Sequence, residues 1–295
     1  MSGLRKPSTT LPVIPRPVGR GSFGALCAPL SVLVLAALVL AGCRHQPAPS
    51  VFQPFDFVQM CDPQLGFTEY AADLRRFDEA VSQINALRPD LVLICGDLVN
   101  RADEKSFADF NAAKARFTIP AYAAPGNHDL GNRPTLQSLE QYRRLVGPDY
   151  YAVDHEGCRF VVLNSQLWQT PVAGETDKQD AWLAQTMETA AKQHRRLFVV
   201  MHHPLFVKAP DEPDEYFNLP RAKRKELLAL FERCSVVAVL TGHTHTTVIN
   251  EYHGMQMVTS ENTSRNFDKH PLGFRLWHVA AQRPYRNEFV PLAGQ

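Results

Sequence analysis

The chain has 295 residues, of which 45% are hydrophobic and 21% charged, which is the composition of a globular protein. Its net charge is +1, but four of its 31 basic residues precede Cys43 with no acidic residue among them, which leaves 27 basic against 30 acidic residues beyond. This balance gives no sign of a nucleic-acid-binding surface, and the length suits a single α/β domain once the N-terminal segment is set aside.

The N-terminal segment has the pattern of a targeting signal. A basic, proline-rich stretch leads into an apolar run at residues 25–41, which ends at Leu40-Ala41-Gly42-Cys43. This ending resembles the lipobox of bacterial lipoproteins, whose cysteine is lipidated and becomes the mature N-terminus. We therefore expect residues 1–42 to be a lipoprotein signal peptide, Cys43 to carry the lipid, and residues 43–54 to be a short stiff tether.

The expected location is a bacterial cell envelope, with the protein anchored to a membrane by its lipid on the periplasmic side. An uncleaved membrane anchor is the alternative explanation of the apolar run. That run is at or below the length of roughly 17–25 residues that a spanning helix needs. The alternative also leaves the position of Cys43 unexplained.

From residue 55 onward, short apolar runs alternate with segments of helical periodicity, the pattern of an α/β protein. Buried strands are predicted at residues 55–60, 91–95, 121–125, 198–201 and 236–240. Helices are predicted where apolar side chains recur three or four apart, along Leu74, Phe77, Val81 and Ile84, then Phe107, Phe110 and Phe117, and then Leu136, Leu139, Tyr142 and Leu145. We find no internal repeat and no second domain.

The second half of the chain predicts both hairpins and helices. Residues 150–153 and 159–163 favour an antiparallel hairpin, and the tail beyond residue 247 favours further strands. Thr176 and Gln179 have the spacing of a capping box at a helix N-terminus, and Pro220 favours the start of another helix. Cys61 and Cys95 each end a predicted strand, and we expect both to be small buried side chains.

Each of the five apolar strands is followed by side chains that bind metals. These are Asp62 and Gln64, Asp97, Asn127, His202, and His243 with His245. Because ligands of α/β sheets bind beyond the carboxyl ends of the strands, we expect these side chains to converge. Singly, each has a structural explanation, as a helix N-cap for Asp97, a turn residue for Asn127, and polar strand ends for the histidines. Together they predict a metal site.

Five short sequence blocks carry a resemblance to a known family. They are Asp62-Pro63-Gln64, Gly96-Asp97-Leu98-Val99-Asn100, Gly126-Asn127-His128-Asp129, His202-His203-Pro204 and Gly242-His243-Thr244-His245. In this order they resemble the calcineurin-like metallophosphoesterases, which include the purple acid phosphatases. The resemblance implies an α/β fold, a four-layer αββα sandwich of two mixed β-sheets flanked by helices, formed by residues 55–295.

The resemblance also implies two divalent metal ions, manganese or iron, with zinc as a further candidate. One ion is expected to bind Asp62, Gln64, Asp97 and His245, and the other Asp97, Asn127, His202 and His243, so that Asp97 bridges them. Gln64 stands where most of the family has a histidine. Its neutral, harder oxygen is expected to lower zinc affinity relative to manganese or magnesium.

His128 and Asp129 are the expected catalytic residues. The resemblance implies that His128 reaches the scissile phosphate, and we expect Asp129 to orient its ring. His203 either faces the substrate or supports the metal ligands. The acidic, proline-rich residues 205–219 are expected to form a loop beside the site that shapes substrate access.

The resulting hypothesis is a monomeric, metal-dependent phosphoesterase that hydrolyses phosphate mono- or diesters with a hydroxide activated by two metals. The alternative is a lipid-anchored lipoprotein that binds metal or phosphate without turnover.

Overall fold

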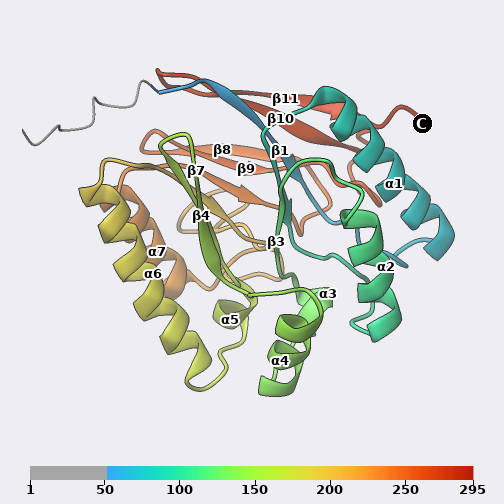
Figure 1. Ribbon diagram of the computed structural model, residues 1–295. Coiled ribbons are helices and arrows are strands. Elements are labelled where there is room, and N and C mark those ends of the chain that lie inside the picture. The colour runs from blue at the N-terminus through green and yellow to red at the C-terminus, as the bar shows by residue number, and fades with distance from the viewer. Residues whose placement is uncertain (1–51, 295) are drawn as a thin grey trace, which may run out of the picture. The chain divides into compact units, whose positions relative to one another are not determined.

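Two mixed β-sheets stack at the centre of the fold, and helices lie on both outer sides of the stack (Figure 1). The computed structural model describes residues 52–294. The predicted signal peptide, Cys43 and most of the predicted tether lie outside the described residues. The layers confirm the expected sandwich of two mixed sheets flanked by helices.

The first sheet has the strand order β11-β10-β1-β2-β3. These strands are β11 (Arg286–Pro291), β10 (Gly273–Val279), β1 (Phe55–Met60), β2 (Leu91–Cys95) and β3 (Ala121–Ala124). Strands β1, β2 and β3 run parallel, whereas β10 and β11 pair antiparallel at the other edge. The helices beside this sheet are α1 (Tyr70–Leu87), α2 (Glu104–Lys114) and α4 (Leu136–Leu145).

The second sheet has the order β4-β5-β6-β7-β9-β8. Its strands are β4 (Tyr151–His155), β5 (Cys158–Val162), β6 (Arg196–Val200), β7 (Val236–Thr241), β9 (Met255–Thr259) and β8 (Val248–Tyr252). Helices α6 (Glu175–Lys192) and α7 (Arg221–Arg233) flank it, on the opposite side of Figure 1 from α1 and α2. Short helices α3 (Asn127–Leu130) and α5 (Gln166–Gln169) follow β3 and β5.

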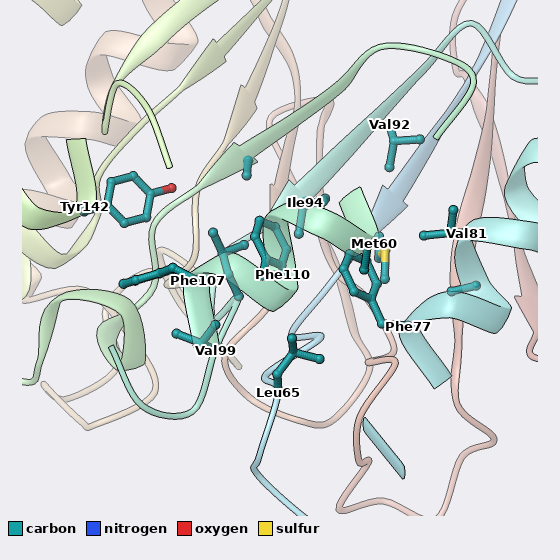
Figure 2. Close-up of a cluster of buried hydrophobic side chains, with 14 of the residues drawn as sticks. Met60, Leu65, Phe77, Val81, Val92, Ile94, Val99, Phe107, Phe110 and Tyr142 are labelled. Atoms are coloured by element: carbon teal, nitrogen blue, oxygen red, sulfur yellow. The ribbon is translucent and has the colours of Figure 1, made fainter. Parts of the chain in front are cut away.

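Apolar side chains fill the space on both faces of each sheet. Figure 2 shows part of the cluster between the first sheet and its helices, where the rings of Phe77 and Phe110 stack with centroids 5.4 Å apart. Between the sheets, the ring of Phe57 stacks on Trp277 at 5.5 Å and meets Phe160 edge-on at 5.2 Å. Each such buried side chain stabilises the fold by about 1.5–3 kcal/mol, so the strand ends are held on a rigid base.

One local prediction is wrong. Helix α6 begins at Glu175, and its N-cap is Gly174 rather than Thr176. The Thr176 hydroxyl accepts from the Val172 amide, and the Gln179 amide turns inward, where it bonds both backbone groups of Asn164. Thr176 and Gln179 therefore have the sequence spacing of a capping box but do not form one, because the Gln179 side chain bonds the backbone of Asn164 instead.

Within residues 52–294, no helix has the length and apolarity required to cross a membrane. Cys61, Cys95, Cys158 and Cys234 are all buried free thiols, as expected for Cys61 and Cys95.

Candidate metal centre

The predicted ligands gather where five strands from both sheets end. Asp62 follows β1, Asp97 follows β2 and Asn127 follows β3, all in the first sheet. His202 follows β6 and His243 follows β7 in the second sheet. The parallel strands of each sheet point the same way, so residues far apart in the sequence reach one place.

Nε2 of His202 and three surrounding atoms form a group of four potential ligand atoms. This Nε2 lies 3.2 Å from Asp97 Oδ2, 3.1 Å from Asn127 Oδ1 and 3.1 Å from Nδ1 of His243. Ligands that bind one cation at about 2.1 Å with tetrahedral or octahedral angles lie about 3.0–3.4 Å from each other. These four atoms therefore already have the spacing of a metal site.

The second predicted set lies beside the first. Asp62 Oδ1 is 3.8 Å from His245 Nε2, and both Asp62 oxygens lie 3.2 Å from the backbone amide of His243. Gln64 is fully buried, yet its Oε1 has no hydrogen-bond partner. Because an unpartnered buried oxygen is costly and amide oxygens bind hard cations, this residue fits a metal ion.

Backbone carbonyls fix the orientation of all three ligand histidines. Nδ1 of His202 lies 2.9 Å from the Cys95 carbonyl, and Nδ1 of His245 lies 2.7 Å from that of Arg265. In His243 it is Nε2 that meets a carbonyl, at 3.0 Å from Tyr216. A carbonyl can only accept, so these nitrogens carry protons. The lone pair of each neutral ring is then left on the nitrogen that faces the other predicted ligands.

The Asn127 amide is oriented in the same manner. Its Nδ2 donates to Asn132 Oδ1 at 3.0 Å and to the Tyr216 hydroxyl at 3.2 Å. The amide oxygen is thereby turned toward His202, as a metal ligand requires.

Backbone strain is concentrated at these ligands. Asp62, Gln64, Asp97, His243 and His245 all have φ between 37° and 73°, in the left-handed region. Non-glycine residues adopt this region rarely, and they persist there mainly at functional sites.

Two glycines permit the close approach of strand ends. A Cβ atom at Gly126 would lie 2.1 Å from Asp97 Oδ1, and one at Gly242 would lie 2.2 Å from Asp62 Oδ2. The glycines of these two motif blocks are therefore explained by the space that the carboxylates occupy.

The charges of the site interact strongly. Burial opposes a charged His202 ring, but the charge of Asp97 and its hydrogen bond outweigh burial and raise the pKa of His202 to about 10. Burial likewise opposes a charged Asp97, yet His202 lowers the pKa of Asp97 below its usual value. Burial and the charge of His202 lower the pKa of His243 to about 3. Without metal, a proton on His202 thus supplies the positive charge that the carboxylate needs.

His128 lies beside the ligands, half-buried, at the start of α3. Its backbone amide donates to Asp97 Oδ1 at 2.9 Å, and its Nδ1 lies 3.1 Å from the Asn100 carbonyl. The expected contact between Asp129 and this ring is absent, since the Asn100 carbonyl occupies that position.

Asp129 instead holds two loops together. Its carboxylate accepts from the amides of Leu98 at 3.0 Å, Val99 at 3.1 Å and Gly126 at 2.7 Å. These amides belong to the segments that carry Asp97 and Asn127. The Asp129 carboxylate therefore fixes the distance between Asp97 and Asn127. The prediction that it orients the ring of His128 is wrong.

Sequence reasoning missed Tyr216 and Asn100. The residue 205–219 loop was expected beside the site, but the role of its Tyr216 in orienting both Asn127 and His243 was not. Asn100 contacts the His128 ring through its backbone carbonyl, and the identity of a side chain does not predict a contact of this kind. His203, whose role was left open, is buried, with its Nδ1 2.9 Å from the Ser165 hydroxyl and its ring 4.3 Å from that of His243.

Comparisons with known proteins agree with this arrangement. Residues 56–247 match the family described as calcineurin-like phosphoesterase. The chain is 33% identical to the serine/threonine-protein phosphatase CPPED1 of Rattus norvegicus over 255 residues, covering 78% of this chain and 82% of the relative. It is 29% identical to the glycerophosphodiester phosphodiesterase GpdQ of Enterobacter lignolyticus over 188 residues, covering 61% of this chain and 66% of that relative.

Solved structures share the fold. A dimetal phosphatase from Danio rerio superposes with a TM-score of 0.61 at 15% identity, over 81% of this chain and 99% of that one. A purple acid phosphatase from yellow lupin seeds superposes with a TM-score of 0.59 at 17% identity, over 79% of this chain and 50% of that one. The chain therefore belongs to the calcineurin-like phosphoesterase family, whose members are hydrolases of phosphoester bonds.

Proposed function

We propose that this chain hydrolyses phosphate mono- or diesters at a centre of two divalent metal ions. The observation that carries the proposal is the set of ligand atoms from Asp97, Asn127, His202 and His243 at metal-like spacing. Beside it lies the unpartnered oxygen of Gln64.

The ligand assignment is the one that the family resemblance implies. Asp62, Gln64, Asp97 and His245 hold one ion in this proposal, and Asp97, Asn127, His202 and His243 hold the other. Asp97 would be shared by both ions in this assignment, and its carboxylate is held in place, with Oδ2 toward His202 and Oδ1 accepting from the amide of His128. Manganese or iron fits this donor set, with zinc as the third candidate.

Two bound ions supply positive charge at the attacking and leaving oxygens and make a bound water more acidic. The residues around them then act on the substrate. His128 Nδ1 is held by the Asn100 carbonyl, so Nε2 is the nitrogen that exchanges its proton. Water adds to phosphorus as the ester P–O bond breaks, and His128, protonated on both nitrogens, donates its Nε2 proton to the leaving oxygen. The proton that the attacking water loses then restores the His128 ring.

Asp129 is a positioning residue in this mechanism. By holding the amides of Leu98, Val99 and Gly126, it keeps Asp97 and Asn127 at their mutual spacing. The names of matching relatives support both ester classes, since one is a protein phosphatase and another a phosphodiesterase.

The test is hydrolysis of para-nitrophenyl phosphate and of bis(para-nitrophenyl) phosphate by purified protein, stripped and reloaded with manganese. We expect turnover of at least one ester. For glycerol phosphate, whose alkoxide leaving group needs a proton, we expect His128→Ala to lose about 10²–10⁴-fold in kcat with unchanged metal content. His253→Ala is the matched control, because His253 is exposed and contacts Glu232 away from the site. Full metal loading without cleavage of either ester contradicts the proposal and favours the lipoprotein that binds without turnover.

We also propose that Cys43 carries a lipid anchor and that the domain works in the bacterial envelope. The support is the apolar run that ends at Leu40-Ala41-Gly42-Cys43. Metabolic labelling with a fatty acid should mark the protein and should not mark Cys43→Ser. Equal labelling of the two proteins would refute the assignment.

A further inference from the structure

Three exposed aromatic rings surround the candidate metal centre. Among residues 52–294, six large hydrophobic side chains are exposed, namely Leu87, Leu136, Tyr216, Phe217, Ile249 and Phe267. The three aromatic ones all lie beside ligand histidines: the rings of Tyr216 and Phe217 are 4.8 Å and 5.5 Å from that of His243, and Phe267 stacks 4.7 Å from His245. A group of solvent-exposed aromatic side chains beside a candidate reaction centre indicates a surface that binds a ligand.

A cavity of about 480 Å³ opens next to these rings. Phe217 and Phe267 both line it, as do Thr244 and Thr246, and the rings of these two phenylalanines contact those of His243 and His245. Val207, Pro213 and Val248 add apolar surface to the wall, and its remaining residues are polar or charged, namely Lys208, Glu212, Glu215 and Asn218. A volume of this size fits a ring system as well as its substituents.

The wall that carries Phe217 is rigidly built. The buried Arg224 guanidinium donates to the Pro210, Glu212 and Leu219 carbonyls at 2.8–3.2 Å. The Glu212 carboxylate accepts from the amides of Val207, Lys208 and Ala209 and from the side chain of Asn218. One acidic side chain of the 205–219 loop, Glu212, therefore serves to fold the loop.

The opposite wall is also fixed in place. The Phe267 amide donates to the His245 carbonyl at 2.6 Å, and Asp268 accepts from the amide of Thr247 at 2.9 Å. The two phenylalanine rings are thus held before any ligand arrives, which lowers the entropic cost of binding between them.

We propose that this cavity is the subsite for the leaving group and that it takes a planar aromatic ring, as in an aryl phosphate or a nucleoside 5′-phosphate. The inference rests on the proposed phosphoesterase function. The occupant is a ring because the wall offers aromatic faces, and aromatic contacts at such distances favour stacking. Each phenylalanine is expected to contribute about three- to tenfold in selectivity.

The kinetic test compares, for each substrate, the kcat/KM of a variant with that of the wild type. For manganese-loaded protein, kcat/KM is measured with phenyl phosphate, a nucleoside 5′-monophosphate and glycerol phosphate. The variants are Phe217→Ala and Phe267→Ala, each checked for metal content because Phe267 touches His245. Taking the ratio of variant to wild type for each substrate cancels the intrinsic reactivity of the leaving groups.

We expect the preference for at least one ring-bearing substrate over glycerol phosphate to fall about three- to tenfold in each variant. The substrate whose preference falls identifies the source of the ring. Leu136→Ala is the control, because Leu136 is 54% exposed, close to the 51% of Phe267, and is absent from the cavity wall. Unchanged preferences for both ring-bearing substrates would overturn the inference.

A binding test separates this inference from the proposed function. Calorimetry of the manganese-loaded protein with phenylphosphonate and methylphosphonate requires no turnover. We expect phenylphosphonate to bind more tightly and to lose that advantage in both phenylalanine variants. If no ester is hydrolysed but this selectivity is present, the proposed function fails and the subsite stands; equal binding of the two phosphonates rejects the subsite alone.

Discussion

Gln64 stands at a position where the family resemblance leads us to expect a histidine. Its amide oxygen is neutral and buried without a partner, in a position expected to contact a metal ion. Replacing it with histidine substitutes a softer nitrogen donor, and the backbone φ of 37° is compatible with a histidine.

We predict that Gln64→His raises the ratio of bound zinc to bound manganese when the protein is loaded from an equimolar mixture. Elemental analysis of the purified protein measures this ratio directly. Gln59→His is not a suitable control, because Gln59 is bonded within the core, so the exposed Gln193→His serves instead. An unchanged ratio would mean that Gln64 is not a ligand.

The raised pKa of His202 makes metal binding dependent on pH. At pH 7 the ring is protonated in the metal-free protein, since its pKa is about 10, whereas a cation requires the Nε2 lone pair. Binding should therefore release about one proton from this ring, and affinity should rise with pH up to about 10. Calorimetry in buffers of different ionisation enthalpy counts the protons, and a count of zero would contradict the assignment of His202.

The predicted ligand side chains were easier to identify from the sequence than the groups that orient them by hydrogen bonds. Asp62, Asp97, Asn127, His202 and His243 follow strand ends, so strand periodicity alone led to one sheet edge. Tyr216 and Asn100 contribute backbone carbonyls to His243 and His128, and a carbonyl has no sequence signature. The Tyr216 hydroxyl also contacts Asn127, but it comes from a loop whose path the sequence does not predict. Asp129 was expected at the His128 ring because the two are adjacent in sequence, but three backbone amides compete successfully for its carboxylate.

At the scale of elements, helix α7 and the 205–219 loop depend on one buried cation. Arg224 is fully buried, and its guanidinium satisfies three loop carbonyls. Arg224→Leu would leave these carbonyls without their donor, at a cost of about 2–3 kcal/mol in the free energy of unfolding.

We expect Arg224→Leu to lower kcat/KM as well as stability, because the loop carries Tyr216, which orients Asn127 and His243. Urea unfolding followed by circular dichroism measures the first effect. Lys225→Leu, at the exposed neighbouring position on α7, is the control. A loop that kept its stability in Arg224→Leu would show that these hydrogen bonds contribute little.

Parallel strands were easier to predict than the rest of the sheets. Strands β1, β2, β3, β6 and β7 are near-continuous apolar runs, because helices or the second sheet cover both their faces. The pairing of β10 with β1 joins residues more than 200 positions apart. Periodicity carries no information on such pairings, so the division into two sheets came from the family resemblance.

At the scale of the molecule, the proposed metal centre would join the two sheets. Asp62, Asp97 and Asn127 come from one sheet, and His202 and His243 from the other. Ions bound here would bind the folded chain far better than the unfolded one. They should therefore stabilise it by about 2.7 kcal/mol at one hundred times their Kd.

Manganese is accordingly expected to raise the melting temperature by roughly 5–10 °C, and EDTA to reverse the increase. Differential scanning calorimetry provides the measurement. Asp97→Ala should melt at the same temperature with and without manganese, and a persistent increase in that variant would place the stabilising ion elsewhere.

The central claim is that Asp97 lies between two metal ions held by both sheets. A crystal structure of the manganese-loaded protein, with anomalous data collected near the manganese edge, tests it most directly. We predict two anomalous peaks roughly 3.5–4 Å apart, one on each side of the Asp97 carboxylate. No peak within reach of Asp97, His202 and His243, under conditions in which the protein hydrolyses phosphoesters, would contradict the account.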